Sequence, residues 1–129
     1  FQDLFGYLDM VMLDLASRTL PDGTALKDRV TIMVFSEMGR AMELNSWEGK
    51  DHWTTTSAMF IGAGIQGGQV VGAFDDLGVG APIDLKTGEI SSAGTMLMPG
   101  HVGATLLALG DVDPGPYIGR TDPILGLLK

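Results

Sequence analysis

The chain has 129 residues, a hydrophobic fraction of 45%, a mean hydropathy of +0.23 and no cysteine. This composition is typical of a globular domain, and it excludes disulfides, thiolate metal sites and a cysteine nucleophile. The formal net charge of -8 and the scattered basic residues argue against binding to nucleic acid or to an anionic membrane surface.

Residues 1–20 have the apolar spacing of an amphipathic helix. The aspartates fall mostly off the apolar stripe, and Pro21, Asp22 and Gly23 form a stop and turn signal. We therefore expect a helix whose apolar stripe faces the core. The stripe consists of Phe1, Leu4, Phe5, Leu8, Val11, Met12 and Leu15.

Two apolar runs, residues 30–35 and 57–63, read as strands separated by a polar loop over residues 41–56. The first run is almost continuous and rich in β-branched residues, which suits a strand buried on both faces of a parallel sheet. Polar residues follow it at 36–40, where open α/β sheets bind their ligands. The pattern predicts an α/β fold with a mostly parallel sheet flanked by helices.

The second half of the chain predicts short strands and turns over residues 69–95, followed by one helix. Pro99 suits the first helical turn and Gly110 suits the end of the helix. His101 would then lie in the first turn, where we expect its ring to cap or pack. The tail after Asp111 carries three prolines and is expected to be mostly irregular.

Three residues near the two apolar runs could bind a divalent metal. If the strands are parallel neighbours, the Glu37 carboxylate and the His52 imidazole can meet above the sheet, as a partial site for Zn²⁺ or Mn²⁺. Asp51 would add an oxygen ligand or orient the ring. The alternative is an ion pair between Glu37 and Arg40, with His52 hydrogen-bonded to the backbone.

Several ordered motifs resemble the DUF1501 family, a bacterial branch related to the alkaline phosphatase–sulfatase superfamily. The likeness runs from about residue 30 to residue 120. The motifs are SEMGR at 36–40, Asn45, GKDHW at 49–53, GGQVVGAFD at 67–75 and HVGATLL at 101–107.

The resemblance implies a partial alkaline-phosphatase-like sandwich, with residues 1–129 as a single domain that forms the C-terminal portion of a larger one. In the superfamily pattern, Glu37 stands at the place of a metal-binding aspartate and His52 at that of a later metal-binding histidine. Met38 replaces a further histidine ligand, which favours one metal or none, and Zn, Mn or Ca are the candidates. Asp51 completes the expected metal set, and Arg40 and Asn45 are the expected substrate-binding residues.

The implied function is that of a C-terminal segment of a metal-dependent phosphate- or sulfate-ester hydrolase-like protein. Superfamily members carry their nucleophile near the start of the domain, so this segment is expected to lack it and to be inactive alone. The alternative is a non-catalytic structural or binding module whose metal site has decayed. The expected partners are the remainder of the parent protein and a second copy of the chain, without nucleic acid or membrane insertion. Family members commonly carry secretion signals, which implies a periplasmic or extracellular location.

Overall fold

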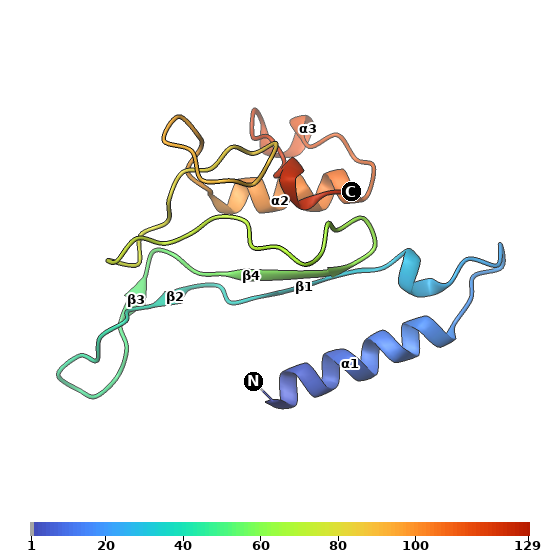
Figure 1. The fold of residues 1–129 in the computed structure, drawn as a ribbon, viewed down its shortest axis with the longest axis horizontal. Helices are drawn as coiled ribbons and strands as arrows, with labels where there is room; N and C mark the ends of the chain where they lie inside the picture. The colour runs from blue at the N-terminus through green and yellow to red at the C-terminus, as the bar shows by residue number, and fades with distance from the viewer. Residues whose placement is uncertain (1) are drawn as a thin grey trace. The chain divides into compact units, whose positions relative to one another are not determined.

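The computed structural model describes residues 2–129 (Figure 1), and the chain divides into two compact units. The first unit comprises the residues up to 34 together with 59–65, and the second comprises 35–58 and 66–129. The expectation that the whole chain is one domain of a larger parent domain stays a prediction.

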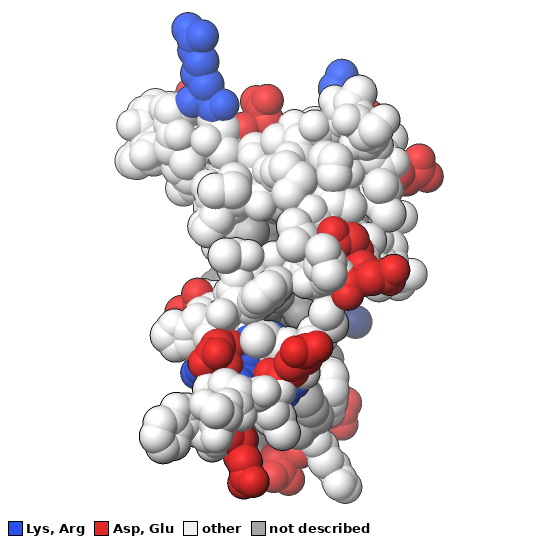
Figure 2. Space-filling view, turned by 90° about the vertical axis from the view of Figure 1, so that its left-hand side faces the viewer, with Lys and Arg blue, Asp and Glu red and all other residues white. Residues whose placement is uncertain are grey.

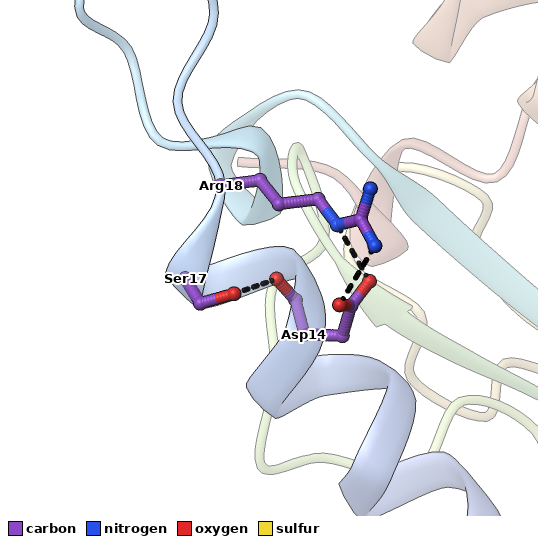
Figure 3. A network of polar contacts seen from close by, with 3 residues as sticks. All are labelled: Asp14, Ser17 and Arg18. Carbon is purple, nitrogen blue, oxygen red and sulfur yellow. Dashed lines mark hydrogen bonds and ion pairs between the residues drawn. The ribbon is translucent and has the colours of Figure 1, made fainter.

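The first unit contains α1 (Gln2–Ser17), which confirms most of the helix predicted over residues 1–20. Phe1, the first residue of the predicted stripe, lies outside the described residues. At the end of α1 the carboxylate of Asp14 pairs with the guanidinium of Arg18 at 2.8 Å, and the hydroxyl of Ser17 donates to the Asp14 carbonyl (Figure 3). Both partners of the ion pair are exposed, so it adds little stability.

The apolar stripe of α1 is not buried. Leu8, Met12 and Leu15 are half-buried, and α1 contacts the short 3₁₀ helix η1 (Leu26–Asp28). No described residue of α1 is fully buried, so the prediction of a core-facing stripe is wrong for this unit as it stands.

The turn at residues 21–23 confirms the stop signal. The backbone N–H of Gly23 donates to the carbonyl of Leu20 at 2.9 Å, and Gly23 has a φ of 85°. The backbone N–H of Thr24 donates to the Asp22 carboxylate and lowers the pKa of that carboxyl group. Asp22 thus stays charged and holds the turn.

The two predicted strands are present as β1 (Thr31–Phe35) and β4 (Ala58–Gly62), and they pair with each other. The carbonyl of Val30, just before β1, accepts from the backbone N–H of Ala63, just after β4, at 2.9 Å. The start of one strand therefore lies at the end of the other, and the pair is antiparallel.

The predicted mostly parallel sheet, and with it the alkaline-phosphatase-like sandwich flanked by helices, is overturned. Within residues 2–129 the sheets are two short antiparallel pairs, with no parallel sheet. Parallel neighbours need a crossover, usually a helix, whereas residues 36–57 fold back as a hairpin. A continuous apolar run does not specify the direction of pairing, and Phe35 is in fact 65% exposed.

The second strand pair consists of β2 (Gly39–Arg40) and β3 (His52–Trp53), which lie side by side in Figure 1. This pair is antiparallel, with Gly39 opposite Trp53 and Arg40 opposite His52. We call residues 36–57 the arm and residues 41–51 its tip. The indole N–H of Trp53 donates to the carbonyl of Gly78 at 2.8 Å, which fastens the arm to a loop of the same unit.

The rest of the second unit contains α2 (Pro99–Leu109), α3 (Gly115–Ile118) and the 3₁₀ helix η2 (Leu125–Leu127). Pro99 and Gly110 bound α2, as the sequence predicts. The fully buried apolar side chains of this unit are Ile83, Ala104 and Ile124. The core is therefore small and lies beside α2 and the tail.

Thr105 and His101 join α2 to that tail. The hydroxyl of Thr105, which has no exposed surface, donates to the carbonyl of His101 at 2.7 Å and accepts the backbone N–H of Ile124 at 2.9 Å. The Nδ1–H of His101 donates to the carbonyl of Asp122 at 2.9 Å. This confirms the packing role expected for His101 in the first helical turn.

Among the helices within residues 2–129, none has the length and apolar character needed to cross a membrane.

Replacing Gly39 with alanine should open the arm. Gly39 is buried, and a Cβ there would collide with the backbone carbonyl of Thr55. We expect the free energy of unfolding to fall by about 1–3 kcal/mol, measured by urea denaturation, because the backbones must move apart. The control is Gly67→Ala, since nothing lies within 4 Å of a Cβ at Gly67. Equal effects of the two changes would contradict this packing.

Replacing Thr105 with valine tests the junction between α2 and the tail. The change keeps the side-chain shape but leaves the buried N–H of Ile124 without its acceptor. We expect a loss of about 1–3 kcal/mol in the free energy of unfolding. Thr56→Val is the control, because Thr56 is exposed. A Thr105→Val chain as stable as the control would show that the hydroxyl bridge does not hold the tail.

Candidate functional site

The five candidate residues all lie on the arm. Glu37 follows β1, Arg40 belongs to β2, Asn45 lies in the tip, and Asp51 and His52 lie at the start of the returning strand. Asn45 is half-buried and the other four are exposed. The structure therefore brings these five residues onto one hairpin.

Asn45 organises the tip through its own side chain. Its Oδ1 accepts from the backbone N–H groups of Trp47 and Gly49, both at 3.0 Å, and its Nδ2 donates to the Asp51 carboxylate at 2.8 Å. Its backbone N–H also donates to the carbonyl of Gly49 at 2.8 Å. The amide of Asn45 thus has its partners within the tip, and one oxygen of Asp51 is engaged there too.

Two basic side chains at or beside the tip also bind backbone carbonyls. The ammonium of Lys50 donates to the carbonyl of Met42 at 3.1 Å, and Nη1 of Arg40 donates to the carbonyl of Lys50 at 3.3 Å. Glu48 adopts a φ of 58°, which the tight turn at this position requires. These contacts give the tip a defined conformation without a ligand.

The expected alternative pairing of Glu37 is not formed. Within residues 2–129 the ion pairs are Asp14–Arg18 and Asp22–Arg29, so neither Arg40 nor His52 has a carboxylate within 4 Å. No side-chain hydrogen bond holds the ring of His52 in the described part of the chain. Arg40 faces His52 directly across the strand pair instead.

The candidate metal ligands do not form a three-ligand group. Among residues 2–129, no three or more histidine, aspartate and glutamate side chains lie close enough together to hold a metal ion. The antiparallel register gives the physical reason, because it sets Arg40, and not Glu37, opposite His52. A cation beside a guanidinium would also be repelled.

The two tryptophans of the arm differ in their environment. Trp53 anchors the arm through Gly78, whereas Trp47 is 88% exposed at the tip. The role of Asn45 as the centre of the tip was not expected from the sequence. An asparagine four residues before a glycine is a signal for such a turn, because the amide oxygen can accept from the following backbone N–H groups.

Two shallow, open depressions lie elsewhere on the second unit. One is lined by residues of 69–72 and 87–90, and the other by residues of 83–86 and 91–95. Neither contains any of the five candidate residues. The candidate residues on the arm thus lie outside both depressions.

Comparison with known proteins places the arm within a family pattern. The family model described as "Protein of unknown function (DUF1501)" matches residues 12–87, which is more than half of the chain and includes all five candidate residues. No curated protein and no solved structure matches the chain.

Replacing Asn45 with alanine should loosen the tip and leave the rest of the unit intact. The amides of Trp47 and Gly49 lose their acceptor, so we expect their hydrogen exchange to accelerate about tenfold, in line with the loss of about one hydrogen bond. Ser46→Ala, at an exposed neighbouring position, is the control. Unchanged exchange in Asn45→Ala would contradict the role given to this amide.

Proposed function

Because the chain belongs to the DUF1501 family and its candidate ligands form no three-ligand group among residues 2–129, we propose that it is a non-catalytic structural and binding module with a decayed metal site. The observation that carries this proposal is the register of the arm, which pairs His52 with Arg40. A histidine beside a guanidinium is poorly placed to bind a cation.

The contacts of the other candidate residues support the same proposal. Asn45 and Asp51 bond to each other in the tip, so their side chains have a structural use. Met38 offers a thioether where a metal-binding histidine would be expected from the superfamily pattern, and a thioether is a poor ligand for hard divalent ions. These residues therefore offer fewer side chains able to bind a hard divalent metal than the superfamily pattern implies.

The binding role rests on α1. Large apolar side chains on more than one side of this helix are exposed: Leu4, Phe5, Tyr7, Met10, Val11 and Leu13. A helix that is apolar on several sides is normally buried in a larger core. We propose that the remainder of the parent protein covers this helix; the alternative is that a second copy of the chain covers it. We also propose that the parent protein is periplasmic or extracellular.

A second candidate function is that of a metal-dependent phosphate- or sulfate-ester hydrolase-like protein related to the alkaline phosphatase–sulfatase superfamily. The observation in its favour is that Glu37 and His52 are exposed on one arm, where ligands from elsewhere in the parent protein can reach them. A divalent metal there would supply Lewis-acid chemistry. The nucleophile would come from outside this chain.

Calorimetric titration of the metal-stripped chain with Zn²⁺ and with Mn²⁺ separates the two functions. We expect no saturable binding that depends on His52, because the described ligands do not converge. His52→Ala and Glu37→Gln are the matched variants. Tight binding that disappears in both variants would contradict the module and favour the metal-dependent hydrolase-like protein.

A further inference from the structure

Two side chains of the arm meet at one glycine of the loop at residues 74–80, within the second unit. The indole N–H of Trp53 donates to the carbonyl of Gly78 at 2.8 Å. A Cβ placed on Gly78 would lie 3.2 Å from the indole nitrogen, 3.4 Å from the methyl carbon of Met42 and 3.9 Å from its sulfur. The outgoing and the returning chain of the arm therefore both approach this glycine. We call Met42, Trp53 and Gly78 the latch.

The loop that carries Gly78 has a defined conformation. The Asp75 carboxylate accepts the backbone N–H groups of Leu77 and Val79, both at 2.9 Å, and the Asp75 backbone N–H donates to the carbonyl of Val79 at 2.9 Å. Gly78 adopts a φ of 73°, a left-handed conformation that favours glycine. The Gly78 carbonyl is thus held in place, and fastening of the arm depends on the side chains that reach it.

The thioether of Met42 is accessible although it belongs to the latch. Met42 is 62% exposed, so a small oxidant can reach its sulfur. A thioether packs as an apolar, polarisable group, whereas a sulfoxide is polar and carries an oxygen that accepts hydrogen bonds. Oxidation therefore converts an apolar neighbour of the latch hydrogen bond into a competing acceptor.

The composition of the chain favours an uncharged oxidant. The formal net charge is -8, and acidic side chains are spread over the face shown in Figure 2. Such a surface repels anionic oxidants such as hypochlorite, whereas a hydroperoxide is uncharged at pH 7. The chain also has no cysteine that would react with a peroxide first. The oxidant class that fits is a hydroperoxide, with hydrogen peroxide as its simplest member.

We propose that Met42 is an oxidation site whose conversion to the sulfoxide releases the arm from the loop at residues 74–80. The sulfur attacks one oxygen of hydrogen peroxide, so that an S–O bond forms and the O–O bond breaks. The sulfur loses two electrons, and the departing oxygen takes the proton of the attacked hydroxyl and leaves as water. The sulfoxide oxygen then competes with the Gly78 carbonyl for the Trp53 indole N–H. The site needs neither a metal nor a cover over α1 and therefore goes beyond the proposed function.

The test measures hydrogen exchange of the Trp53 indole N–H by NMR in the full chain, before and after treatment with hydrogen peroxide. Peptide mass mapping locates the sulfoxides. Once Met42 is oxidised, exchange should accelerate about threefold to tenfold, in line with the loss of about one hydrogen bond. The indole of Trp47, which is 88% exposed, is the internal reference and should exchange at the same rate before and after. Methionine sulfoxide reductases should restore the slow exchange of Trp53.

Three variants separate oxidation of Met42 from oxidation elsewhere. Met42→Leu keeps the apolar packing and removes the oxidation site, so its Trp53 indole should stay slow after peroxide. Met98→Leu is the matched control, because Met98 is 61% exposed in the same unit and its loss should leave the acceleration intact. Met42→Gln places a polar acceptor at the site and should accelerate exchange without peroxide.

Three results would each overturn the proposal. The first is unchanged exchange of the Trp53 indole in a chain whose Met42 is fully oxidised. The second is an equal acceleration by peroxide in Met42→Leu. The third is loss of the effect in Met98→Leu, since the responsible sulfur would then lie outside the latch.

Discussion

The hydroxyl of Thr105 is the interaction on which the second unit depends. It accepts the backbone N–H of Ile124 and donates to the carbonyl of His101, and so connects α2 to the chain's tail within the buried core. A second hydrogen bond, from the His101 ring to the carbonyl of Asp122, also joins α2 to the tail. Polar groups buried this deeply are stable only when both partners are present. The core residues Ile83, Ala104 and Ile124 lie in the unit that this junction organises.

The first unit lacks a comparable core. Its one buried apolar residue among those described is Ile65, and α1 exposes large apolar side chains such as Phe5 and Leu13. Exposed apolar surface of this kind is stabilising only when another surface covers it. The arm is stabilised differently. Hydrogen bonds from the backbone to the side chain of Asn45 hold its tip, and few of its residues are buried. The chain therefore combines a second unit with a small buried core and a helix whose large apolar side chains are exposed.

The elements that the sequence predicts well are those with local signals. The apolar period of α1, the β-branched run of β1, and Pro99 and Gly110 around α2 all depend on near neighbours along the chain. The direction in which β1 and β4 pair depends on how residues 36–57 turn back, and an apolar run carries no information about that. The candidate residues were expected at the edge of a parallel sheet, and they lie instead on an antiparallel hairpin. The sequence could not predict which of these residues are neighbours, because that follows from the strand register, which sets Arg40 opposite His52.

The most direct test is amide hydrogen exchange of the dilute chain, with its monomeric state checked by sedimentation. It measures whether the junction of α2 and the tail is the most stable part of the chain and whether α1 is unstable without a covering surface. The account predicts strong protection for the amides of α2 and for Ile124, and exchange in α1 close to that of an isolated helix. Protection of α1 in the monomer equal to that of α2 would contradict it.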